Sequence, residues 1–269
     1  MTPIEIATEA AHAGATVLLD HWENLTREDA LLKGRNDWVS RADRESELAI
    51  IAAIRNHCPD DSFLGEEGGT IHSVNPGSPR TWVIDPLDGT SNYLQHFPFW
   101  SISIALREGE ETVAGLVYEP LRSQFFSAEL GAGAFRNGLP MRVSGHDGLD
   151  GSFLATGFPF RAQKQVHTYV RIFEEVIRQA KGVRRAGSAA LDLAYTAAGV
   201  FDGFFELHLA PWDVAAGALL VREAGGVVSD FSGGDLFWEQ GNIVGATPGI
   251  HAELMKVVNR YTNEANLSR

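Results

Sequence analysis

The sequence predicts a layered α/β protein, and three observations along the chain indicate it. Two amphipathic helical patterns come first, over residues 4–22 and 43–57. A block of short strand-like segments, separated by Gly- and Pro-containing turns, then runs to about residue 150 and is typical of an antiparallel sheet. Beyond it, helical and strand-like patterns alternate. We expect subdomains over residues 1–150 and 151–269, packed together because no low-complexity linker separates them.

The two N-terminal helices are predicted from the spacing of apolar and small residues. The first places such residues on one side: Ile4, Ala7, Ala11, Gly14, Val17 and Leu18. In the second we expect Leu48, Ile51 and Ile54 to be buried, and Pro59 to stop the helix.

The remaining elements are predicted from apolar runs and from the turn-forming residues that separate them. Strands are predicted over residues 62–65, 82–85, 101–106, 113–118, 124–128, 153–156, 204–207 and 227–228. Helices are predicted over residues 163–180, 188–198, 214–224 and 248–261.

Charge, cysteine content and hydropathy exclude several classes of partner and location. The 269-residue chain has a formal net charge of −13, which argues against a nucleic-acid partner because phosphate backbones are bound by clustered Lys and Arg. Cys58 is the only cysteine, so no intramolecular disulfide is possible. Neither a signal peptide nor an apolar stretch of spanning length (~18 residues) is evident. We expect a soluble, cytoplasmic protein without a membrane partner.

A short run of carboxylates is the strongest chemical feature. Asp85 ends an apolar strand-like segment and Asp88 follows three residues later in a tight turn that Pro86 stiffens, so both can point at one spot. Oxygen ligands of this kind suit a hard divalent cation. The N–H groups of Gly89 and Thr90, at a possible helix start, suit a phosphate oxygen. A plain Asp-rich turn is the structural alternative. Covalent chemistry of the haloacid-dehalogenase type needs aspartates two apart, and that spacing is not met.

Two further acidic positions support a metal centre. Glu66 stands in Gly65-Glu66-Glu67-Gly68, where glycines leave the carboxylates uncovered. Asp213 directly precedes the predicted helix 214–224, so it is expected to be an N-cap whose second oxygen can bind metal.

These three segments, in this order and spacing, resemble the inositol monophosphatase family over essentially the whole chain. The resemblance rests on Gly65-Glu66-Glu67, the run from Trp82 to Asn92, and Trp212-Asp213 with Glu223-Ala-Gly-Gly226. The resemblance implies a five-layer αβαβα sandwich, a homodimer, two to three Mg²⁺ ions per site and lithium sensitivity.

The resemblance also implies the ligand sets. Glu66, Asp85 and the Leu87 carbonyl would bind the first metal; Asp85, Asp88 and Asp213 would bind the second. The nucleophilic water would lie between Glu66 and Thr90.

A further acidic residue, Asp43, would orient the Thr90 hydroxyl, although it could instead simply cap the second helix. Lys33 and Asp37 match family positions near the cleft, in a stretch (residues 33–38) that could close over the site.

For the alcohol side of the substrate, the family positions are Gly187, Ser188, Ala189 and Glu206, with Asp88 and Asp213 contributing. They favour myo-inositol 1-phosphate. Histidinol phosphate, fructose 1,6-bisphosphate and 3′-phosphoadenosine 5′-phosphate are the alternatives, and a non-catalytic regulatory scaffold is the alternative from another class. Glu206 could also be an outward-facing strand residue, and Ser188 a plain helix N-cap.

Overall fold

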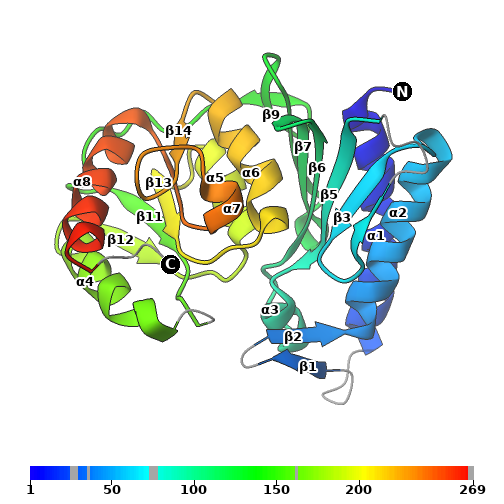
Figure 1. Ribbon diagram of the computed structural model, residues 1–269, viewed down its shortest axis with the longest axis horizontal. Helices are drawn as coiled ribbons and strands as arrows, with labels where there is room; N and C mark the ends of the chain where they lie inside the picture. Colours follow the sequence, from blue (N-terminus) through cyan, green and yellow to red (C-terminus); the bar gives the residue numbers. More distant parts are fainter. Residues whose placement is uncertain (25–29, 35–36, 73–77, 161–162, 266–269) are drawn as a thin grey trace.

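The computed structural model describes residues 1–24, 30–34, 37–72, 78–160 and 163–265; within these, the side chains of 30–34, 37–40 and 263–265 are left aside. Five layers alternate between helices and sheets (Figure 1). This is the αβαβα arrangement expected from the sequence.

The first layer consists of helices α1 (Pro3–Asn24) and α2 (Arg41–His57), which pack against each other and against the first sheet. That sheet has eight strands in the order β10-β9-β8-β7-β6-β5-β3-β4, and all neighbours are antiparallel except β3 and β5. Its strands are β3 (Ser62–Gly65), β4 (Gly69–Ile71), β5 (Arg80–Asp88), β6 (Ser101–Glu108), β7 (Glu111–Glu119), β8 (Gln124–Glu129), β9 (Gly133–Arg136) and β10 (Leu139–Met141).

Helices α5 (Ala189–Ala197) and α6 (Pro211–Glu223) form the middle layer, between the two sheets. Every residue of α6 from Asp213 to Val221 is buried, as expected for a helix covered on all sides. Packing here is close: a Cβ at Gly115 of β7 would lie 3.0 Å from the Ala216 Cα atom. The helix that carries Asp213 is therefore held rigidly against the first sheet.

The second sheet has five strands in the order β12-β11-β13-β15-β14. They are β11 (Phe153–Thr156), β12 (Gly182–Arg184), β13 (Gly203–Glu206), β14 (Val227–Ser229) and β15 (Ile243–Ala246). Helices α4 (Val166–Ile177) and α8 (Pro248–Ala265) form the outer layer. Shorter elements are β1 (Ala30–Gly34), β2 (Asp37–Ser40), α3 (Thr90–Leu94), α7 (Phe237–Gln240) and the 3₁₀ turns Pro120–Arg122 and Gln163–Gln165.

The predicted elements are present, with two corrections in α2. The helix begins at Arg41, so Asp43 lies inside its first turn, fully buried, and is not a cap. Leu48 was expected in the core but is 67% exposed; the buried face carries Glu47 and Ile50 instead. The short strands β4, β9, β10, β12 and β15 were not predicted from the sequence.

The two sheets use different parts of the chain. The first uses residues from 62 to 141, the second residues from 153 to 246, and the helices between them come from the C-terminal part. The division at residue 150 remains a prediction. Within the part of the chain that the structure describes, no helix has the length and apolarity needed to cross a membrane.

Candidate metal and phosphate site

A β-bulge directs Asp85 and Asp88 to the same side of the first sheet. Residues three apart on a regular strand point to opposite faces. Here Asp85 pairs with Ser103 and Asp88 with Ser101, so three steps along β5 match two steps along β6. The extra residue reverses the alternation. The bulge includes Pro86, which has no N–H to donate to a regular ladder.

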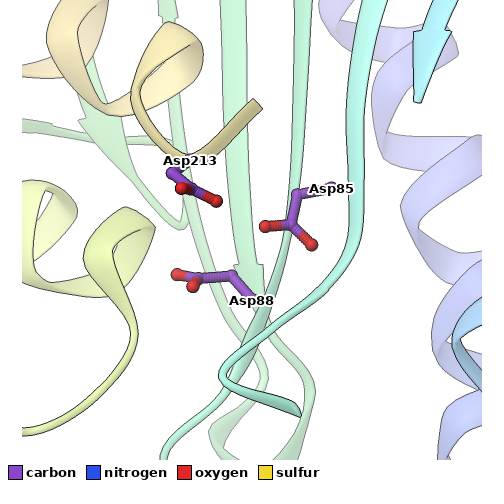
Figure 2. Close-up of side chains that lie close together, drawn as sticks. All are labelled: Asp85, Asp88 and Asp213. Carbon is purple, nitrogen blue, oxygen red and sulfur yellow. The ribbon is translucent and has the colours of Figure 1, made fainter. Parts of the chain in front are cut away.

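Asp213 approaches the same point from α6. One carboxylate oxygen each from Asp85, Asp88 and Asp213 lie within 4.8 Å of one another (Figure 2). Asp213 is not the N-cap that was expected. Ala210 is the N-cap, and Asp213, three residues into the turn, accepts a 2.7 Å hydrogen bond from the Ala210 N–H.

Hydrogen bonds hold the aspartates in place. The Asp88 Oδ2 atom accepts from the Ser188 hydroxyl at 2.5 Å and from the Ala190 N–H at 2.7 Å. The Asp85 Oδ1 atom accepts from the Leu87 N–H at 3.0 Å. The donors to Asp88 belong to the start of α5, so the middle layer fixes a side chain of the first sheet.

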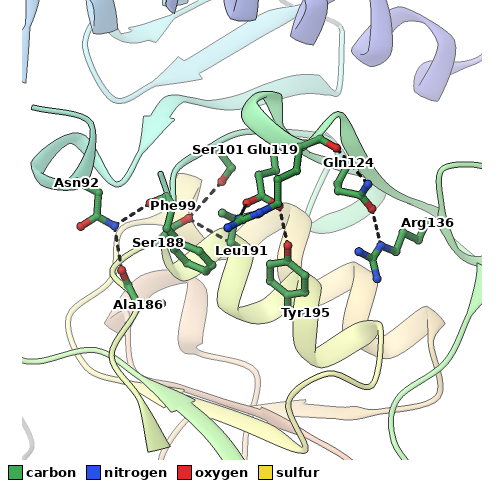
Figure 3. A network of polar contacts seen from close by, with 11 residues as sticks. Asn92, Phe99, Ser101, Glu119, Gln124, Arg136, Ala186, Ser188, Leu191 and Tyr195 are labelled. Carbon is green, nitrogen blue, oxygen red and sulfur yellow. Dashed lines mark hydrogen bonds and ion pairs between the residues drawn. The ribbon is translucent and has the colours of Figure 1, made fainter. Parts of the chain in front are cut away.

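Other polar contacts join α5 to the first sheet (Figure 3). The Asn92 side-chain amide donates to the carbonyls of Phe99 at 2.7 Å and Ala186 at 2.9 Å. The Tyr195 hydroxyl donates to the buried carboxylate of Glu119 on β7 at 2.6 Å. These contacts fix the loop before α5 and the far end of the helix, so its first turn is held over Asp88.

The buried carboxylates of the site disfavour one another's ionised form. Burial raises the pKa of Asp85 well above its usual range, and the charges of Glu66, Asp88 and Asp213 raise it further. Burial, followed by the charge of Asp213, raises the pKa of Asp88 to about 7. A divalent cation reverses this balance, because it favours the ionised form of every carboxylate around it. The donor set is all oxygen, as Mg²⁺ prefers.

Glu66 lies in the turn between β3 and β4 and lines the same cavity as the aspartates, although it lies outside the compact group of three. The turn is built around a carboxylate of α2. Glu47 accepts a 2.9 Å hydrogen bond from the Glu67 N–H. A Cβ at Gly65 would lie 2.3 Å from the Glu47 Oε2 atom, and one at Gly68 would lie 2.7 Å from Oε1. A side chain at either glycine would therefore force the Glu47 carboxylate to move.

Thr90 follows Gly89, whose φ of 97° brings the chain sharply from β5 into α3. The Thr90 Oγ1 atom lies 3.0 Å from the Asp43 Oδ1 atom and 3.1 Å from the Leu87 carbonyl oxygen. One hydroxyl proton serves one acceptor at a time. The structure thus brings Thr90 and Asp43 together although they are 47 residues apart.

A cavity of about 580 Å³ contains these groups, and its wall includes Gly89 and Thr90 as well as the metal-site carboxylates. Its other half is lined by Gly187, Ala189 and Glu206, as expected. Ser188 differs: its side chain is buried, it is absent from the cavity wall, and its hydroxyl bonds Asp88 and caps α5.

Several residues near the site were not predicted. Asp192, Arg185, Phe158 and Phe160 also line the alcohol half of the cavity. Glu47 and Asp192 share a signal that was available in the sequence, since each is an acidic residue on a helix face made mostly of apolar and small residues; Asp43 is a second acidic residue on the face of Glu47. Nothing is described of the predicted side chains in the 33–38 stretch, including Lys33 and Asp37.

Sequence relatives cover nearly the whole chain. The chain is 44% identical over 247 residues to Nus factor SuhB of Escherichia coli strain K12, with 92% of each chain covered. It is 41% identical over 260 residues to Nus factor SuhB of Pseudomonas aeruginosa, with 96% of each covered.

Solved structures show the same fold. The extragenic suppressor protein suhB from Bartonella henselae has a TM-score of 0.89 and 38% identity, with 96% of this chain and 98% of that chain covered. The inositol monophosphatase from Anabaena has a TM-score of 0.84 and 36% identity, with 95% and 94% covered. A family model described as "Inositol monophosphatase family" matches residues 2–263. The chain belongs to the inositol monophosphatase family.

Proposed function

We propose that this protein hydrolyses small phosphate monoesters with Mg²⁺, and that myo-inositol 1-phosphate is its preferred substrate. The observation that carries the proposal is the convergence of Asp85, Asp88 and Asp213 on one point of a cavity that also contains Glu66 and Thr90. Phosphate monoesters are among the slowest esters to hydrolyse unaided, so the site must lower a very large barrier.

The residues fit a pair of hard cations. Glu66, Asp85 and the Leu87 carbonyl would hold one ion; Asp85, Asp88 and Asp213 would hold the other, and a third, weaker ion would use Glu66 through water. Bound Mg²⁺ supplies an activated water and stabilises the leaving oxygen. The neighbouring Gly89 and Thr90 backbone would receive the phosphate.

Thr90 and Asp43 would orient the attacking water. If the Leu87 carbonyl is a metal ligand, the cation repels a proton directed at that oxygen, and the Thr90 hydroxyl would donate to Asp43 instead. The Thr90 oxygen then accepts from water, and Glu66 provides a second acceptor. No covalent phospho-enzyme is required.

The alcohol half of the cavity supports a polyol. The Glu206 carboxylate lies so close to Gly157 that a Cβ there would be 1.8 Å from its Oε1 atom. With Gly187, Ala189, Asp88 and Asp213 it would accept or donate hydrogen bonds to ring hydroxyls. Histidinol phosphate, as a cation, would also suit Glu206 and is the main alternative; fructose 1,6-bisphosphate and 3′-phosphoadenosine 5′-phosphate follow.

Further properties belong to the same proposal: a homodimer, a cytoplasmic location and inhibition by lithium. The alternative of a different class remains a non-catalytic regulatory scaffold, and relatives named Nus factor are an observation in its favour. The intact set of acidic residues favours an enzyme.

The test compares initial rates on the four phosphate esters with and without Mg²⁺, for the wild type and for Asp88→Asn. We expect inositol 1-phosphate to be hydrolysed fastest and Asp88→Asn to lose at least 100-fold in kcat, the size of loss seen when one electrostatic group of a site is removed. Asp150→Asn, at an exposed position, is the control and should match the wild type. Full activity of Asp88→Asn would refute the metal assignment, and hydrolysis of no ester would favour the scaffold.

A further inference from the structure

Asp192 is a buried acidic residue in the first turn of α5 with no evident structural task. Only 1% of its surface is exposed. Its backbone is satisfied within the helix, because its N–H donates to the Ser188 carbonyl and its carbonyl accepts from the Thr196 hydroxyl. Its Oδ1 atom, however, has no hydrogen-bond partner among the described residues.

An unpaired buried carboxyl oxygen lowers the stability of the folded protein, because it loses its hydrogen bonds to water and gains none in return. Native proteins leave few such groups, and those that persist require a reason. The preceding residues, Ala189-Ala190-Leu191, are apolar, and an apolar residue of similar shape at position 192 would avoid this cost. The carboxyl group of Asp192 is therefore retained for something other than packing.

The position of Asp192 indicates a ligand. Asp192 and Ala189 lie three residues apart, on one face of α5, and both line the cavity. Burial raises the pKa of Asp192 well above its usual range; the charges of Glu206 and Asp88 raise it further, and that of Arg185 opposes them. All three of these neighbours line the same cavity. A protonated carboxyl can both donate and accept a hydrogen bond, as a hydroxyl can.

We propose that Asp192 is a specificity-determining residue that binds a hydroxyl group of the substrate, beside Glu206. The proposal rests on the proposed function and adds a contact to its alcohol side. Glu206 and Asp192 line the same cavity and both offer carboxyl oxygens, so two hydroxyls of a polyol ring can be recognised together. A cavity with a hydrogen-bonding group at this place rejects an ester that lacks the hydroxyl, since Asp192 would stay unpaired.

The test uses two substrates that share a six-membered ring, myo-inositol 1-phosphate and cyclohexyl phosphate, and two variants of similar volume. Asp192→Leu should lower kcat/KM for inositol 1-phosphate at least tenfold, mainly through KM. For cyclohexyl phosphate, kcat/KM should stay within threefold of the wild type. Asp192→Asn, which can still donate and accept, should keep most of the activity on inositol 1-phosphate. Thr196→Ala, one turn further along α5 and outside the cavity wall, is the control: it should change kcat/KM by the same factor for both substrates.

The outcomes separate this proposal from the proposed function. Equal losses of Asp192→Leu on both substrates would overturn it and assign Asp192 to structure, and no loss would mean that Asp192 contacts only water. A wild type without preference for inositol 1-phosphate over cyclohexyl phosphate would also overturn it.

If the wild type hydrolyses neither ester, the proposed function fails, while the contact is still tested by calorimetric titration of inositol 1-phosphate in Ca²⁺. Tenfold weaker binding to Asp192→Leu than to the wild type supports the contact. Equal binding, or none to the wild type, overturns it.

Discussion

Gly65→Ala tests whether the Glu47 carboxylate shapes the turn that presents Glu66. The new Cβ would lie 2.3 Å from the Glu47 Oε2 atom and 2.7 Å from its Cδ atom, distances that real Cβ atoms essentially never show. Glu47 must therefore move, and its 2.9 Å hydrogen bond from the Glu67 N–H is lost. Gly65 does not have a left-handed φ, so alanine adds no backbone strain.

The expected cost combines overpacking, about 1–3 kcal/mol, with the loss of a hydrogen bond to a charged group, about 1.5–3 kcal/mol. Since the two overlap, we expect the free energy of unfolding to fall by about 3 kcal/mol. For a chain of this size that lowers Tm by roughly 6–10 °C. Because Glu66 is in the same turn, the Mg²⁺ concentration for half-maximal activity should rise as well.

A double-mutant cycle provides the decisive comparison. In a Glu47→Ala background the clash is absent, so Gly65→Ala should cost less than about 0.5 kcal/mol. Chemical denaturation measures all four proteins. Gly145→Ala is the control, because a Cβ there meets no atom within 4 Å. Additive costs at Gly65 and Glu47 would refute the reasoning, since each side chain would then act alone.

Two further outcomes are expected at the metal site. The pKa of Asp88 in the folded protein is about 7, against 3.8 as its ordinary value, so its contribution to stability is present below about pH 4 and is lost as pH rises through 7. The Tm increase caused by Mg²⁺ should therefore be larger at pH 8 than at pH 5; an equal increase would contradict this. Ser188→Ala removes the α5 cap and a donor to Asp88, and should cost about 1–3 kcal/mol in denaturation while weakening Mg²⁺ activation.

The sequence predicted the site where its geometry follows from local spacing. Asp213 could be placed beside the start of its helix because helix boundaries leave clear sequence signals, although the boundary itself was three residues too late. The bulge that makes Asp85 and Asp88 converge was not visible, since it is defined by the register with β6. The sequence predicted a tight turn after Asp85, whereas β5 continues to Asp88 and the bulge brings the two carboxylates together.

The missed residues depend on tertiary contacts. Helical periodicity predicts that Leu48 is a core residue. In the structure the Gly65–Gly68 turn packs on the adjacent Glu47, so the face of α2 that carries Glu47 points inward and Leu48 is exposed. Ser188 was expected at the substrate or as a helix N-cap. Its hydroxyl caps α5 and also donates to Asp88, a contact that the sequence did not indicate. The hydrogen-bond partner of a buried polar side chain depends on how the layers pack. That packing is determined by residues far apart in the sequence, so local patterns do not predict the partner.

The metal site joins the first sheet to the middle helical layer, and this leads to a crossover in the stability of Asp88→Asn. The amide can keep the hydrogen bonds from Ser188 and Ala190 through its oxygen, while its NH₂ group faces the other aspartates and removes a buried like charge. A pKa displaced from 3.8 to about 7 corresponds to at most about 4 kcal/mol above neutral pH. Without Mg²⁺ at pH 8, Asp88→Asn should therefore unfold at a higher denaturant concentration than the wild type. At pH 5 the difference should disappear because Asp88 is then protonated.

With saturating Mg²⁺ the order should reverse, since the wild type gains the free energy of ion binding and the variant does not. An Asp88→Asn protein less stable than the wild type at every pH and in both conditions would mean that Asp88 serves the fold rather than the cation. The expected crossover instead identifies a carboxylate that costs stability in the metal-free protein, a cost that bound Mg²⁺ offsets.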